Sequence, residues 1–272
     1  MNLNLKCFFF LLCISLTNLC FSQAQKIVYP HAVFWSKIEV NQLDKKDQWG
    51  WGADLVYRRK SGFDNNNPFA EPLRISFRPW INYQFSPNAR LSISPIGYMR
   101  THEYLGKPED FNRLPYSEWR TTIQYFHHFK PGNPRFMHTW RYRYEMRWQE
   151  NANTGTWRYF NRFRVRYRLR YTFLGKDFYE NNNMYAMMSN EIGINFGKNV
   201  VLNTFNQNRF YADVGYRFWN TARVELRYVD RIRTRGATGF EFDRGRGVMF
   251  TLFIDQLKGL GKADATKVQF TD

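Results

Sequence analysis

The chain of 272 residues is 43% hydrophobic, 19% aromatic and 23% charged, and its formal net charge is +17. This aromatic content excludes an intrinsically disordered chain, and the many charges do not suit the core of an ordinary soluble domain. A fold in which aromatic rings face lipid and polar side chains face an enclosed interior would explain both the aromatic content and the high charge.

The first 22 residues predict a secretory signal peptide. Lys6 supplies the positive start, and the apolar run in residues 7–21 is too short to cross a bilayer as a permanent helix. We therefore expect a signal peptide at 1–22, with cleavage near Gln23 or Gln25, and one domain at 23–272. All three cysteines (Cys7, Cys13 and Cys20) lie inside the signal, so we expect no disulfide or thiolate chemistry afterwards.

Downstream of the signal, the dominant pattern is an alternation of apolar and polar residues with a period of two. No later stretch approaches 18 uncharged apolar residues, which excludes helical membrane spans. The alternation predicts strands whose two faces meet different surroundings. The predicted strands are 33–41, 49–59, 73–85, 90–100, 119–129, 136–149, 157–173, 185–196, 209–219, 222–233 and 248–255.

Two of these segments show the alternation most clearly. Segment 157–173 carries rings and aliphatic side chains on one face and arginines, from Arg158 to Arg170, on the other. Segment 136–149 repeats the pattern, with Trp140 and Tyr142 on one face and arginines on the other. A helix would scatter both sets around its circumference, so both segments are predicted to be strands.

Segment 73–85 is a third example, with Leu73 and Ile75 on the apolar face and Trp80 as the exception beside Pro79. A soluble β-sandwich would also show alternation. However, segments 73–85 and 157–173 are much longer than the usual strand of about 5 or 6 residues. Their length favours a transmembrane antiparallel up-and-down β-barrel.

Short and long connections alternate along the chain, as in outer-membrane barrels. Tight turns are predicted at 86–88, 130–134 and 220–221, and loops at 61–72, 101–117 and 234–247. If the tight turns and both termini are periplasmic, one strand is missing from the set. We therefore expect an even total of ten or twelve, with the extra strand near residues 26–29 or near the C-terminus.

Tryptophans near the predicted strand ends are candidates for the aromatic girdles of a barrel. Such rings lie where the lipid headgroups begin. The candidates are Trp49, Trp51, Trp140, Trp148 and Trp157.

Several stretches resemble a family of bacterial outer-membrane barrels known only as domain of unknown function 2490 (DUF2490). The resemblance covers most of the mature chain, and it implies a barrel without an agreed activity. Its strongest stretches are EWR at 118–120, RYRYEMR at 141–147, RFRVRYRLRY at 162–171, SNEIGIN at 189–195 and FNQNRFYADVGY at 205–216.

The polar faces predict an arginine-rich lumen. On these faces the arginines outnumber the nearby carboxylates, which include Glu118. The interpretation that we favour is a closed, structural barrel filled by an Arg/Glu ladder. The predicted lumen residues are Arg141, Arg143, Glu145, Arg147, Arg164, Arg166, Arg168, Glu191 and Arg209.

Two alternatives remain open at this stage. Excess positive charge in a confined space would also suit an anion-binding lumen or an anion-selective channel. A lipid-modifying enzyme in the barrel is the third class, but no Ser-His-acid set can be assembled from spacing alone, so we predict no enzyme. We expect outer-membrane lipids and small anionic solutes as partners, no cofactor or metal, and, because of export, no nucleic acid.

Overall fold

A computed structural model of the chain describes residues 26–43, 48–130, 132–200, 203–235, 239–258 and 260. The predicted signal peptide, residues 1–22, lies outside these described residues. Among them, no helix is both long and apolar enough to cross a membrane.

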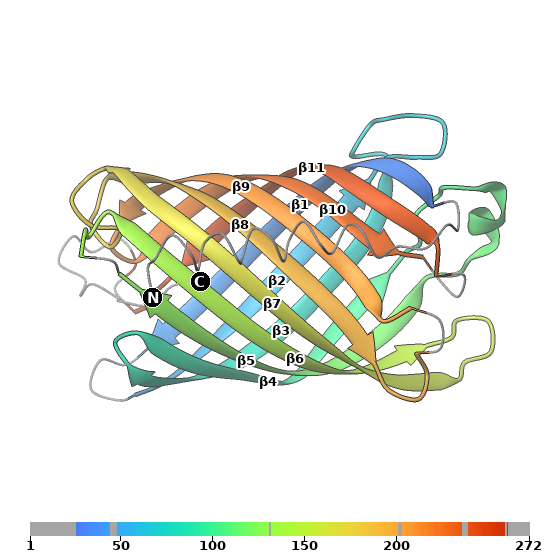
Figure 1. Cartoon of the computed structure of the whole chain (residues 1–272), viewed down its shortest axis with the longest axis horizontal. Coiled ribbons are helices and arrows are strands. Elements are labelled where there is room, and N and C mark those ends of the chain that lie inside the picture. Colours follow the sequence, from blue (N-terminus) through green and yellow to red (C-terminus); the bar gives the residue numbers. More distant parts are fainter. Residues whose placement is uncertain are drawn as a thin grey trace, which may run out of the picture.

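Eleven strands and one short 3-10 helix make up the regular structure of the described residues (Figure 1). All eleven predicted strands are present, most of them one to four residues longer than predicted. The strands are β1 (Ile27–Leu43), β2 (Trp49–Lys60), β3 (Glu71–Ser86), β4 (Ala89–Thr101), β5 (Tyr116–Phe129), β6 (Phe136–Glu150), β7 (Trp157–Leu174), β8 (Asn183–Phe196), β9 (Phe205–Trp219), β10 (Ala222–Thr234) and β11 (Glu241–Ile254), with η1 (Pro108–Asn112) between β4 and β5.

The strands close into a single barrel in which each strand pairs with its neighbours in sequence. The closing pair, β1 and β11, is parallel, and the other neighbouring pairs are antiparallel. An up-and-down chain reverses direction at each connection, so an odd number of strands closes only through one parallel pair. The expected even total was therefore wrong, and the segment at 26–29 leads directly into β1 instead of forming a separate strand.

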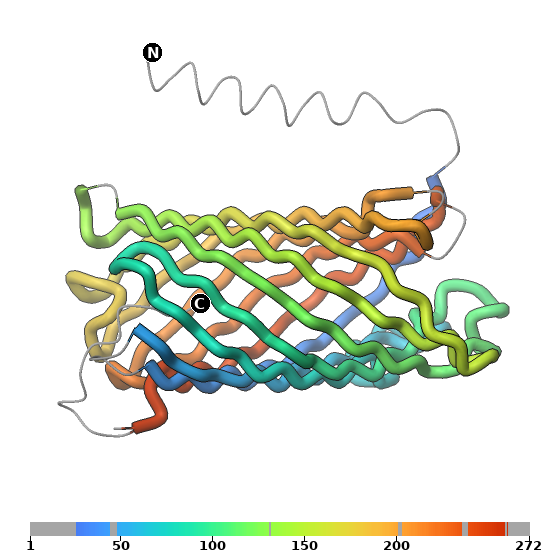
Figure 2. The backbone as a smooth tube through the Cα atoms, turned by 90° about the horizontal axis from the view of Figure 1, so that it is seen from below, coloured from blue at the N-terminus to red at the C-terminus, as the bar shows by residue number. Residues whose placement is uncertain are grey.

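The two ends of the barrel differ in their connections (Figure 2). Strands β1, β3, β5, β7 and β9 finish at one end, which we call the turn end; only Pro87 and Asn88 separate β3 from β4 there. The opposite end, the loop end, carries the long β4–β5 connection at residues 102–115. Because the strand number is odd, β1 begins at the loop end and β11 finishes at the turn end.

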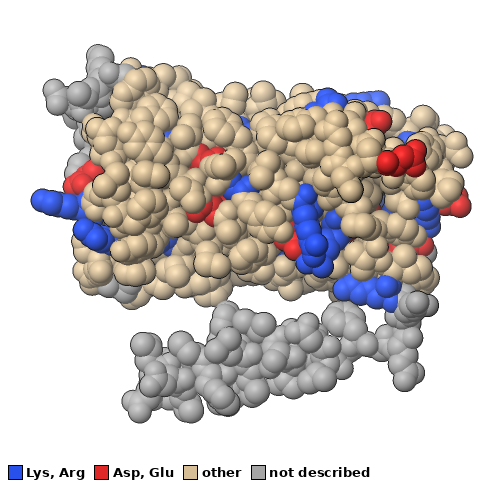
Figure 3. Space-filling view, turned by 90° about the horizontal axis from the view of Figure 1, so that it is seen from above, with Lys and Arg blue, Asp and Glu red and all other residues tan. Residues whose placement is uncertain are grey.

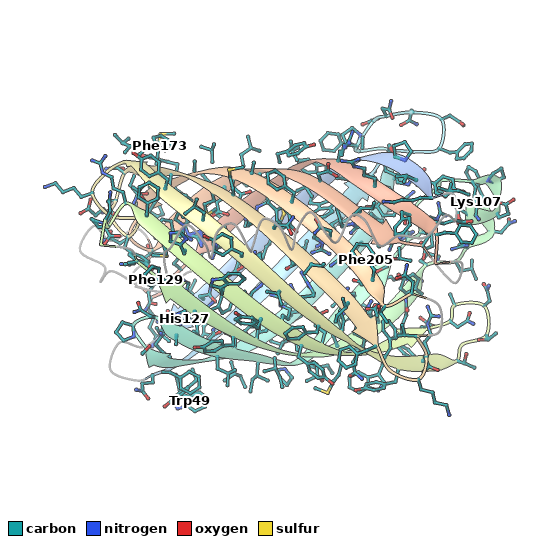
Figure 4. All side chains as sticks on the ribbon, in the orientation of Figure 1. Trp49, Lys107, His127, Phe129, Phe173 and Phe205 are labelled. Carbon is teal, nitrogen blue, oxygen red and sulfur yellow. The ribbon has the colours of Figure 1, made fainter. Side chains whose placement is uncertain are left out.

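Side chains alternate between the lumen and the outer wall as the sequence predicts. In β7 the arginines from Arg162 to Arg170 are buried, whereas Tyr159 and Phe173 are exposed on the wall. One side of the barrel is largely uncharged (Figure 3), and Trp49, Phe129 and Phe173 lie near the turn end (Figure 4). Of the five predicted girdle tryptophans, Trp49, Trp51, Trp148 and Trp157 are exposed on this wall.

Leu73 is an exception to the predicted faces. It is buried with Val33, Trp35 and Tyr104 instead of facing outward with Ile75. The β2–β3 pairing shifts register between Arg58 and Arg59, which breaks the alternation at this point. The prediction for Leu73 was therefore wrong because a bulge is not visible in the period-two pattern.

Glycines make the parallel seam possible. Gly247 lies opposite Val33, and a Cβ atom there would come 1.8 Å from the Val33 carbonyl oxygen. The sequence suggested a loop at 234–247, but half of that segment belongs to β11, which begins at Glu241. That prediction was wrong because glycine, usually a turn residue, serves here for close approach of two strands.

The parallel seam can be tested with cysteine pairs. Ile38 lies opposite Leu252 in the seam, so Ile38→Cys with Leu252→Cys should form a disulfide on mild oxidation, seen as a mobility shift on a non-reducing gel. Ile38→Cys with Val248→Cys is the control, since four residues along a strand place the second Cα roughly 13 Å farther on. Cross-linking of the control pair alone would contradict the register.

Candidate functional site

Glu191 on β8 holds arginines from three neighbouring strands. It accepts a hydrogen bond from Nε of Arg164 at 3.0 Å, and its Oε1 lies 3.4 Å from Nη1 of Arg209. Its second oxygen accepts a hydrogen bond from Arg141. All four side chains are buried, so one carboxylate links β6, β7, β8 and β9 inside the lumen.

Two further glutamates extend these contacts toward the loop end. Glu145 pairs with Arg162 and, at 3.2 Å, with Arg164. Glu118 accepts hydrogen bonds from both Nε and Nη2 of Arg147 at 2.7 Å, a two-pronged geometry that suits guanidinium and carboxylate. Arg120 joins the two glutamates, pairing with Glu118 and lying 3.8 Å from Glu145. We call the connected set the ladder: Glu118, Glu145, Glu191, Arg120, Arg141, Arg147, Arg162, Arg164 and Arg209.

The other three predicted lumen residues are buried as well. Arg143 is buried and donates from Nε to the side-chain oxygen of Gln124 at 2.9 Å. Arg166 and Arg168 are buried on the same face of β7, nearer the turn end, and Arg166 lies opposite Glu191 in the β7–β8 pairing. Six of the nine predicted residues are thus members of the ladder, and all nine are buried.

A second ionic cluster occupies the lumen side of β9, β10 and β11, and sequence reasoning missed it. Within it, Arg227 contacts Asp213 at 2.7 Å and Glu225 at 3.1 Å. The alternation in β10 could have indicated it, because Arg223, Glu225 and Arg227 share one face. The members of this second cluster are Asp213, Arg217, Arg223, Glu225, Arg227 and Asp255.

The β7–β8 connection at the turn end inserts Phe178 and Tyr179 into the barrel; we call these two residues the turn-end plug. Both are buried, and the guanidinium carbon of Arg170 lies 3.5 Å from the centre of the Phe178 ring. Nε of Arg217 donates to the Phe178 carbonyl oxygen at 3.0 Å. The plug is thus fixed by both its ring and its backbone.

The β4–β5 connection folds over part of the loop end, and we call it the lid (residues 102–115). Asp110 is buried and pairs with Arg235 of the barrel. Burial alone would raise the pKa of Asp110, but the hydrogen bonds from Arg235 and from the backbone N–H groups of Gly106 and Lys107 hold it below its usual value. Asp110 therefore anchors the lid as a carboxylate.

A cavity of about 430 Å³, which we call the basin, remains at the loop end beside the lid. Ladder residues Arg147 and Arg162 contribute to its lining. Glu103 supplies the one carboxylate among the described residues that line it. The lining arginines are Arg74, Arg113, Arg147, Arg158, Arg162, Arg231 and Arg233.

The model of a protein family described as "protein of unknown function (DUF2490)" matches residues 33–240. No curated protein matches the chain. The match spans β2 to β10 completely and therefore includes the whole ladder.

The importance of shared carboxylates can be tested with Glu191→Gln. The neutral amide would leave buried arginines without their counter-charge, so we expect the free energy of unfolding to fall by roughly 3–5 kcal/mol. Urea denaturation followed by tryptophan fluorescence measures the change. Glu109→Gln, at an exposed position in η1, is the control and should stay within about 0.5 kcal/mol of the wild type. Equal stability of the two variants would refute the role of the ladder.

The lid anchor can be tested with Asp110→Asn. We expect trypsin to cleave after Arg113 at least about tenfold faster at neutral pH, because the anchoring charge is lost. Since the pKa of Asp110 is lowered, the wild-type anchor is complete above the ordinary carboxyl pKa of about 4 and is lost only as the pH falls below it. Unchanged cleavage relative to Glu109→Gln would show that Asp110 does not hold the lid.

Proposed function

We propose that this chain, which belongs to DUF2490, a family of proteins of unknown function, is a structural outer-membrane β-barrel with a closed lumen. The observation that carries this proposal is the ladder, which fills the lumen with ion pairs between neighbouring strands.

The outer wall supports a membrane location. Strands of 12 to 18 residues exceed the roughly 9–11 residues that a tilted strand needs to cross a bilayer. Their outward faces expose large apolar side chains, including Leu226 and Ile96, over the wall. A soluble protein rarely exposes so much connected apolar surface, whereas lipid is its natural environment. The predicted signal peptide would supply the export that this location requires.

The contents of the lumen support the structural role. Barrels of this size are commonly filled by their own side chains. The ladder joins β5 to β9, the second cluster joins β9 to β11, and the turn-end plug lies beside the latter. Solutes would have to break ion pairs between buried groups to pass, so we infer that the barrel does not conduct.

An anion-selective channel is the second candidate, because the basin is lined by seven arginines at the loop end. Such a channel would need the turn-end plug to move away from Arg170 and Arg217. The contacts of Phe178 with both arginines oppose that movement. A closed lumen therefore agrees better with the geometry.

Conductance in planar lipid bilayers separates the two candidates. We expect no steady conductance from the wild type under conditions in which an open porin conducts. Arg166→Glu combined with Arg168→Glu should prevent folding, seen as loss of heat-modifiable gel mobility, because it reverses two buried charges.

Matched charge reversals at the exposed turn-end residues, Arg135→Glu combined with Lys176→Glu, should fold normally and remain silent. A wild type that conducts anions, together with a folded Arg166→Glu, Arg168→Glu variant that conducts cations, would establish the channel instead.

A further inference from the structure

The basin contains positive charge that the carboxylates of the barrel do not neutralise. Four arginines of its lining pair with acidic residues: Arg113, Arg147, Arg162 and Arg233. Three other lining arginines contact no carboxylate within the described residues. Their hydrogen bonds go to neutral oxygen atoms: Arg74 to Thr101 at 2.8 Å, Arg158 to Gln149 at 2.9 Å and Arg231 to Tyr104 at 3.0 Å.

Two buried donors in the basin lack an acceptor. Arg231 and Gln207 are each 2% exposed, and within the described part of the chain neither Nε of Arg231 nor Nε2 of Gln207 has a hydrogen-bond partner. The side-chain oxygen of Gln207 accepts a hydrogen bond from Arg209 at 2.8 Å, which fixes the amide so that its nitrogen is the free group. Buried donors without acceptors cost free energy, and both side chains line the basin.

The rest of the lining is suited to a sugar. Asn195, Asn199 and Asn206 offer amides that can bind hydroxyl groups, and Phe160 and Phe205 offer apolar ring surface. A volume of about 430 Å³ lies within the range of small-molecule sites. The amides and rings can thus bind the hydroxyl groups and the apolar face of a sugar, while the arginines bind an anionic group of the same ligand.

We infer that the basin binds a phosphorylated saccharide. A phosphate group presents three acceptor oxygens, which suits several guanidinium groups and a buried amide better than the two oxygens of a carboxylate do. Arg74, Arg158 and Arg231 would bind the phosphate, with Gln207 as a further donor. This inference goes beyond the structural role and does not depend on whether the lumen is closed.

Calorimetric titration of the folded protein in detergent tests the inference. Glucose 6-phosphate should bind, and both glucose and inorganic phosphate should bind at least tenfold more weakly. Arg231→Gln and Arg74→Gln should each weaken glucose 6-phosphate binding about tenfold or more, because each removes a charged donor without stranding a carboxylate. Arg158→Gln, at the exposed rim, should weaken it as well and provides a variant whose folding is not at risk.

Arg135→Gln is the matched control, with the same loss of charge at the exposed turn end, and should leave binding unchanged. The phosphorylated glycan of lipopolysaccharide shares the same chemistry. Binding of glucose 6-phosphate assigns a soluble ligand, and binding of lipopolysaccharide micelles alone, weakened by the same variants, assigns a lipid-borne one. Unchanged affinity in all three basin variants would overturn the proposal, as would equal affinity for glucose 6-phosphate and inorganic phosphate.

Discussion

Sharing of buried carboxylates between arginines is the interaction on which the rest of the barrel depends. A guanidinium group inside a narrow lumen is tolerated only when oxygen atoms replace the water that it has lost. Glu191 serves arginines of β6, β7 and β9 at once, so its contacts form only when these strands pair in one register. A slip by one residue would turn each arginine to the outer wall. The ladder therefore determines the register of the strands as well as occupying the lumen.

Aromatic rings also stabilise the buried guanidinium groups, both those that pair with carboxylates and those that do not. The guanidinium carbon of Arg223 lies 3.5 Å from the centre of the Phe253 ring, and that of Arg58 lies 4.1 Å from the centre of the Trp35 ring. The negative face of a ring attracts a cation most strongly where water is excluded. The high aromatic content thus has two uses in this protein, since rings cover the outer wall and also stabilise cations inside.

The sequence was sufficient to predict the strands, their faces and much of the ladder, because these follow from a period of two. Arg141, Arg164 and Glu191 could be placed in the lumen from alternation alone, and the recognised family agrees with the match over residues 33–240. The beginning of β11 could not be predicted, since Gly245 and Gly247 resemble loop residues until their partner strand is known. Phe178 and Tyr104 escaped prediction for a related reason. They lie in connections without periodicity, and their burial depends on arginines distant in the sequence.

The odd strand count gives the two ends of the barrel different roles. The two longest connections, β2–β3 and β4–β5, lie at the loop end, where the lid covers part of the mouth and the basin stays open, whereas the turn end is filled by Phe178. The lid packs Tyr104 against Arg231 and anchors Asp110 to Arg235, so it occupies the side of the mouth formed by β1, β10 and β11. The basin lies beside the lid, lined by the loop-end parts of β3 and of β5 to β10 together with Glu103 and Arg113 of the lid itself. The lid therefore covers one side of the mouth and borders the basin, whose arginines lie at the end where the strands have the longest connections.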